Sequence, residues 1–158
     1  RSSAASDVYK RQGKKSVDSI HKELGHVMWE YVGMGRTAEG LKTGLAKLKE
    51  IRKEFETNLF IPGSKEGMNV ELDKAIRLND FITMGELIAY DALNRNESCG
   101  GHFREEYQTE EGEAKRDDEN YFYVACWEYQ GSDDKAPVLL KEPLVYEAIK
   151  VQTRNYKS

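Results

Sequence analysis

The chain has 158 residues, enough for one domain with a real core but too few for a large cofactor enzyme of two lobes. Its 24 basic and 28 acidic residues give a formal charge of −4, and no Lys/Arg cluster is long enough to hold a phosphate backbone, so nucleic acid is not an expected partner. The apolar runs are far shorter than the roughly 20 residues of a membrane-spanning helix, and the two cysteines lack the spacing of a zinc site or a disulfide framework. We therefore expect a cytoplasmic protein that meets a membrane only through a partner.

The first segment, residues 1–12 (RSSAASDVYKRQ), has no hydrophobic period and no helix-cap signal. It resembles translated adapter sequence, so we predict that it is not native and leave it out of the fold. On this interpretation the chain is a C-terminal fragment of a longer protein that begins before Gly13.

Two amphipathic helices are predicted next. Apolar residues recur every three or four positions from Ser16 to Tyr31, and the pattern stops at Gly33. Thr37 then has the character of an N-cap, and a second apolar stripe follows it as far as Phe55, with Lys and Glu on the opposite face.

A third helix is predicted from Asn69 or Val70 to Leu93. Its later half is apolar nearly all round, which is typical of a helix buried between others. Short connections make neighbouring helices antiparallel, so residues 13–96 are predicted to form a three-helix, up-down-up bundle like a spectrin repeat.

Residues 97–158 are predicted to belong to the same domain and to hold a turn, a long acidic loop, a small antiparallel β-hairpin and a tail. The aromatic run Tyr121–Tyr129 predicts the first strand of the hairpin, and Val138–Leu140 its partner. Pro137 and Pro143 cannot donate to a ladder, which places the second strand at an edge. The expected fold class is therefore mainly α.

Several residue groups have the composition of a reactive site but not its spacing. His21 and His26 are five apart on one helix and do not converge on one ligand. The Gly-Met-Gly of residues 33–35 follows a helix rather than a strand, unlike a dinucleotide fingerprint. Cys99 and His102 lack a third group to orient them. We expect no catalytic, cofactor-binding or metal-ligating residue in this chain.

The acidic loop from Glu105 to Asp118 is interpreted as solvated rather than as a carboxylate pair for acid–base chemistry, which would need burial. His102, Arg104 and Arg116 could together cradle a dicarboxylate through charge-assisted bonds. This is the sharpest hypothesis that residue chemistry alone provides here.

The turn and the end of the loop resemble a known family. The sequences RNESCGGHFR (95–104) and RDDEN (116–120) resemble the R-x-E-S-R-G-A-H-x-R and R-D-D-E-N-W signature of the flavoprotein subunit of succinate dehydrogenase and fumarate reductase. WEYVG (29–33) and RTAEGL (36–41) also resemble the C-terminal helical domain of that family. The chain departs from the pattern at Cys99, Gly101, Glu105 and Tyr121, which suggests a subgroup.

The resemblance implies that the parent protein is an FAD-dependent enzyme interconverting succinate and fumarate, with electrons passing to an iron–sulfur subunit, a membrane cytochrome b subunit and quinone. It implies a location on the inner face of the cytoplasmic membrane through partner subunits. In that family the flavin site and the substrate residues lie before this domain, so the fragment alone is expected to bind no cofactor and to be inactive.

The matched motif residues are then expected to have structural or interface roles, pinning the turn to the FAD-binding domain; they are Glu97, Ser98, His102, Arg104, Arg116, Asp117 and Asp118. The nearly all-apolar third helix is expected to be covered by that domain. Two alternatives remain: an L-aspartate oxidase-like flavoenzyme, whose family shares the E-S-R-G-x-H turn, and a free-standing helical interaction module.

Overall fold

The computed structural model describes residues 13–63, 67–132 and 135–152. Residues 1–12 lie outside this part, so their adapter-like origin stays a prediction. The chain divides into two compact units, one ending at Asn94 and the other beginning at Arg95. The grouping of residues 97–158 with the bundle in a single domain also stays a prediction.

Helix α2 (Val17–Val32) begins and ends where the sequence predicts. Ser16 Oγ accepts a hydrogen bond from the backbone N–H of Ser19 at 3.2 Å and so caps the first turn. At the other end, Arg36 Nε donates to the carbonyls of Val32 at 3.1 Å and Gly33 at 2.8 Å. These bonds satisfy carbonyls that the end of a helix otherwise leaves without partners.

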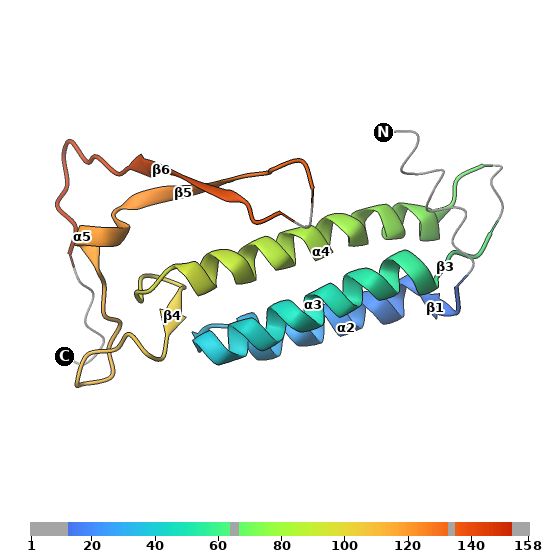
Figure 1. The fold of residues 1–158 in the computed structure, drawn as a ribbon, viewed down its shortest axis with the longest axis horizontal. Helices are drawn as coiled ribbons and strands as arrows, with labels where there is room; N and C mark the ends of the chain where they lie inside the picture. The colour runs from blue at the N-terminus through green and yellow to red at the C-terminus, as the bar shows by residue number, and fades with distance from the viewer. Residues whose placement is uncertain (1–12, 64–66, 133–134, 153–158) are drawn as a thin grey trace. The chain divides into compact units, whose positions relative to one another are not determined.

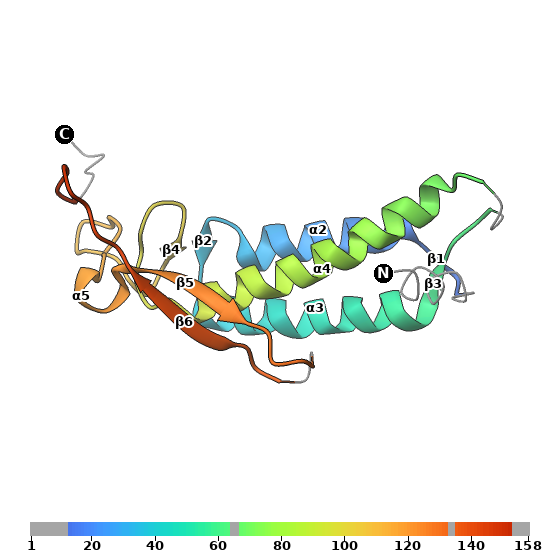
Figure 2. The same ribbon diagram turned by 90° about the horizontal axis from the view of Figure 1, so that it is seen from above.

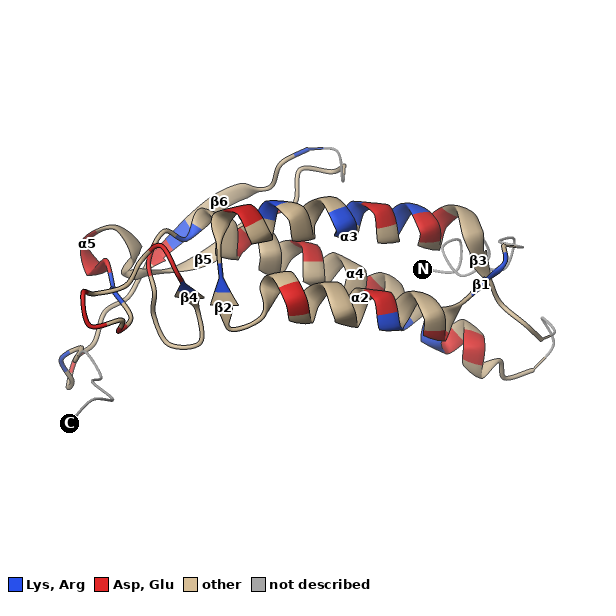
Figure 3. Ribbon diagram, turned by 90° about the horizontal axis from the view of Figure 1, so that it is seen from below, with Lys and Arg blue, Asp and Glu red and all other residues tan. Residues whose placement is uncertain are grey.

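Helix α3 (Ala38–Asn58) follows the short extended segment β2 (Gly35–Arg36). Thr37 is its N-cap, as predicted, since Thr37 Oγ1 accepts from the N–H of Gly40 at 2.9 Å. Lys and Glu follow one another along the outer face of α3 (Figure 3). This charged face leaves the apolar stripe of the helix to the core.

Helix α4 (Val70–Asn94) is capped by Asn69, whose Oδ1 accepts from the N–H of Leu72 at 3.1 Å. Its inner face is buried and consists of Ala75, Leu78, Ile82, Gly85, Ala89 and Ala92. Phe81, Met84 and Ile88 remain between 42% and 53% exposed. Within this chain the later half of the helix therefore differs from the sequence-based expectation of a helix buried between others, and its cover by a further domain stays a prediction.

The three long helices lie side by side in both views (Figures 1 and 2) and form the predicted bundle. The buried core comes from all three: Val17, Ile20, Leu24, Val27 and Val32 of α2; Leu41, Leu48, Ile51 and Phe55 of α3; and the inner face of α4. Small residues set the spacing, because a Cβ on Gly44 would lie 2.9 Å from Cβ of Tyr31.

Polar contacts between the helices fix their register. Arg52 Nε of α3 donates to both carboxylate oxygens of Glu86 on α4 at 3.0 Å. The strands β1 (Lys15–Ser16) and β3 (Leu59–Phe60) pair in parallel, with Lys15 opposite Leu59. This pairing joins the start of α2 to the end of α3.

The second unit holds the predicted hairpin. Strands β5 (Tyr123–Glu128) and β6 (Val138–Pro143) are antiparallel, with Tyr123 opposite Pro143 and Glu128 opposite Val138. The strand begins at Tyr123 rather than at the predicted Tyr121, because Asp117 caps a short helix, α5 (Asp118–Tyr121), just before it. The partner strand runs three residues beyond the predicted Leu140.

Within the part of the chain that the structure describes, no helix is long and apolar enough to cross a membrane.

Candidate functional site

The motif residues build a compact turn at the start of the second unit. Cys99 and His102 exchange both backbone hydrogen bonds, with N···O distances of 2.8 and 3.0 Å. Gly100, the first residue between them, has a φ of +58°, a conformation that favours glycine. The Gly-Gly pair therefore makes a tight reversal, and β4 (Phe103–Arg104) continues from it.

Glu97 is the polar centre of this turn. The residue is only 2% exposed, and its Oε1 accepts from Arg95 Nε at 2.8 Å. Its Oε2 accepts from the backbone N–H of Asp117 at 2.8 Å. Each carboxylate oxygen of this buried residue therefore has a hydrogen-bond donor, and the side chain ties the turn to the segment that precedes α5.

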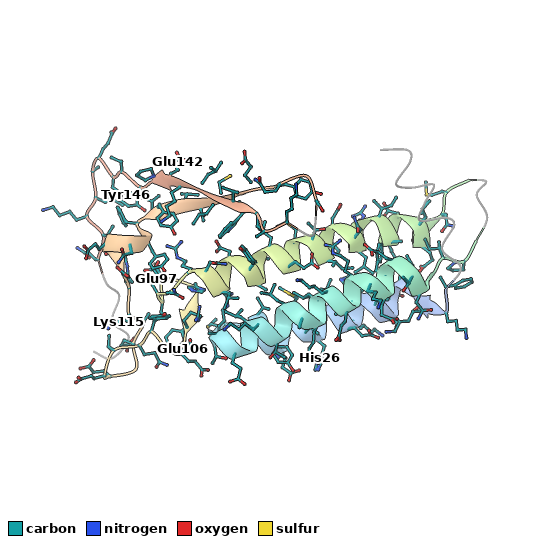
Figure 4. All side chains as sticks on the ribbon, viewed as in Figure 1. His26, Glu97, Glu106, Lys115, Glu142 and Tyr146 are labelled. Atoms are coloured by element: carbon teal, nitrogen blue, oxygen red, sulfur yellow. The ribbon has the colours of Figure 1, made fainter. Side chains whose placement is uncertain are left out.

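Ser98 closes the turn on its inner side. Its hydroxyl accepts from the N–H of Arg104 at 2.8 Å and donates to the carbonyl of the same residue at 3.1 Å. Its own N–H donates to the carbonyl of Lys115 at 2.9 Å. Lys115 and Glu97, the residue before Ser98, are labelled in Figure 4. Ser98 is completely buried, so these bonds replace water for both backbone groups of Arg104.

Arg104 is also buried, at 2% exposed, although it carries a charge. Its Nε donates to Glu106 Oε2 at 3.1 Å, and its guanidinium carbon lies 5.4 Å from the ring centre of Tyr107. Tyr107 and Lys115 then start a second small hairpin through the bond from Lys115 N to Tyr107 O at 3.1 Å. The predicted acidic loop thus contains ordered backbone pairing.

The R-D-D-E-N segment caps α5. Asp117 Oδ1 accepts from the N–H of Asn120 at 3.2 Å, and Arg116 Nε donates to Asp118 Oδ1 at 3.0 Å. Burial alone would lower the pKa of Arg116, but the hydrogen bond to Asp118 and the neighbouring Cys99 and Glu97 raise that pKa above its usual value. Arg116 therefore remains a cation among acidic groups.

The dicarboxylate hypothesis can be compared with these contacts. His102 Nε2 lies 3.0 Å from the carbonyl oxygen of Arg95 and, since a carbonyl only accepts, this nitrogen carries the proton. Arg104 is directed to Glu106, and Arg116 to Asp118. The three side chains thus have protein partners on different segments of the unit, and their contacts describe a folded turn rather than a substrate cradle.

Arg95 belongs to the matched motif but is not among the residues expected above to have a structural or interface role, although its contacts hold the turn. Besides binding Glu97, its guanidinium donates to the carbonyl of Tyr121 at 2.9 Å and lies 5.8 and 5.9 Å from the ring centres of Tyr121 and Tyr123. It therefore connects the turn to α5 and β5. The available signal was its position two residues before Glu97 in the matched motif.

A flavin nucleotide does not fit the glycine-rich segment of this chain. Gly33, Met34 and Gly35 follow α2 instead of a strand, and the N–H of Gly40 in the first turn of α3 is already bonded to Thr37. A pyrophosphate would need such amide groups. Over the described ranges there is also no cluster of three or more His, Cys, Asp or Glu side chains able to hold a metal ion.

Comparison with known proteins identifies the family of the chain, which the contacts of the turn do not by themselves reveal. A family model for the C-terminus of the fumarate reductase flavoprotein matches residues 21–156. The chain is 33% identical over 112 residues to the fumarate reductase flavoprotein subunit of a Serratia species, covering 71% of this chain and 18% of that protein. It is 35% identical over 89 residues to L-aspartate oxidase 2-b of Nicotiana tabacum, covering 56% of this chain and 13% of that protein.

The fold agrees with these relatives. A solved structure of quinol–fumarate reductase with menaquinol molecules contains a chain that superposes with a TM-score of 0.77 at 25% identity, covering 94% of this chain and 25% of that one. The chain spans less than a fifth of the length of the curated relatives that it matches. With its motif turn, its helical bundle and its hairpin, the chain belongs to the family of fumarate reductase and succinate dehydrogenase flavoprotein C-terminal domains.

Proposed function

We propose that this chain acts as the C-terminal domain of a longer FAD-dependent oxidoreductase that interconverts succinate and fumarate. The observation that carries the proposal is the family match over residues 21–156, which includes both the bundle and the motif turn. The glycine-rich segment at residues 33–35 does not fit a flavin pyrophosphate, and we assign FAD and the dicarboxylate to the portion of the longer protein outside this chain.

The work of the domain is then structural. The bundle presents apolar residues of α4 that remain half exposed, and such surface is usually covered by another part of a protein. We assign it to contact with the flavin-binding portion, and we assign the turn around Glu97 and Arg104 to keeping that contact in register. By itself the fragment is expected to be inactive.

The proposal also includes the partners to which the parent protein passes electrons. The similar solved structure is of a quinol–fumarate reductase, which supports an assembly with an iron–sulfur subunit and, through it, with a membrane cytochrome b subunit and quinone. The parent protein would then lie on the inner face of the cytoplasmic membrane without a membrane-spanning helix in the described part of this domain.

An L-aspartate oxidase is the second candidate, supported by the 35% identity to the tobacco enzyme. The fumarate reductase relative aligns over 112 residues against 89 for the oxidase, which favours the reductase. A free-standing helical interaction module is a third possibility that the test below separates.

The test is to read the DNA upstream of the segment that encodes Gly13 and to express the complete protein. We expect a strand followed by a glycine-rich turn, a bound flavin visible by absorbance, and reduction of fumarate by a reduced dye or oxidation of succinate with an electron acceptor. Hydrogen peroxide formed from L-aspartate and oxygen would identify the oxidase instead. A start codon near Gly13 with no flavin-binding sequence would reject both enzymes.

A further inference from the structure

We draw no further inference here: the strongest candidate, the exposed face of the β5–β6 hairpin on which Val124, Cys126, Val138 and Leu140 lie between Glu128 and Glu142, is an apolar surface patch, and nothing in the described part of the structure shows what covers it.

Discussion

Glu97 joins two segments of the turn through its buried carboxylate. Its two carboxylate oxygens each accept one donor, from Arg95 and from the N–H of Asp117. Glu97→Gln keeps the shape but replaces one acceptor by an NH₂ group, so one of these donors loses its partner. We expect local opening of the turn to become easier by about 2 kcal/mol, seen as about 30-fold faster hydrogen exchange of the amides of Arg104 and Asp117.

The matched control is Glu110→Gln in the exposed part of the same unit. This change should leave the exchange of both amides unaltered. Equal rates in the wild-type chain and in Glu97→Gln would mean that the buried ion pair contributes nothing to the turn.

Glu54 provides a prediction about pH. The hydrogen bond from the Asn58 amide, at 3.0 Å, and the ammonium of Lys15, at 3.5 Å, lower the pKa of Glu54 below its usual 4.5. A lowered pKa in the folded state means that the stabilisation is present above pH 4.5 and is lost as the pH falls through the folded-state pKa. Carboxyl titration by NMR should show that Asn58→Ala raises the pKa of Glu54, whereas Thr57→Ala leaves it in place.

At this scale the sequence predicted which residues form the turn but not how they interact. The motif marked Glu97, Ser98 and Arg104, all of which are buried. It did not indicate that Ser98 would bind both backbone groups of Arg104, because contacts to the backbone depend on the path of the chain. The interface role of the motif residues stays a prediction.

Thr37 illustrates the element scale, since one side chain begins α3. Thr37→Ala removes the acceptor for the N–H of Gly40 and should lower the free energy of unfolding by about 1 kcal/mol in denaturant titrations. Thr37→Ser keeps a hydroxyl and should recover most of this loss. Thr43→Ala, at an exposed position inside α3, should not destabilise the chain. If Thr43→Ala costs as much as Thr37→Ala, capping is not the cause.

Helices were predicted more accurately than strands. The periods of α2, α3 and α4 and the cap at Thr37 are local signals, and the observed ends of α2 and α4 agree with them to within one or two residues. Helix α3 runs to Asn58, three residues beyond Phe55, the last apolar residue of its predicted stripe. The hairpin was placed from the aromatic residues alone, so its start was assigned to Tyr121. Asp117 competes locally by capping α5, and that short helix moves the first paired residue to Tyr123.

Both units of the molecule have large apolar side chains that are exposed. On α4 of the bundle, Phe81, Met84 and Ile88 are 42–53% exposed, and on the hairpin Val124, Val138 and Leu140 are 46–49% exposed. We expect the folded chain to bind a hydrophobic dye, and the double change Met84→Lys with Ile88→Lys should reduce the dye fluorescence without lowering the thermal midpoint, because neither residue belongs to the core. Ala46→Lys is the control; an equal loss of fluorescence there would assign the signal to net charge.

The sequence could predict this exposed apolar surface only in part. The composition of α4, apolar nearly all round, indicated a surface awaiting a neighbour. Trp29, which is 84% exposed, gave no such signal, because a single apolar residue on the outer side of an amphipathic helix is ordinary. In the structure the ring of His21 on α2 stacks on that of Phe81 on α4 at 5.5 Å, a contact between helices that the sequence pattern of neither helix indicates.

The short parallel pairing of β1 with β3 sets a practical limit on how the domain can be trimmed for crystallography or NMR. Gly13 N donates to Leu59 O at 2.8 Å, and a Cβ at Gly13 would overlap the backbone of Asn58, so the chain passes against the end of α3 before entering α2. A recombinant piece that starts at Val17 would lose this clasp together with the hydroxyl of Ser16. Cloning boundaries should therefore lie ahead of Gly13.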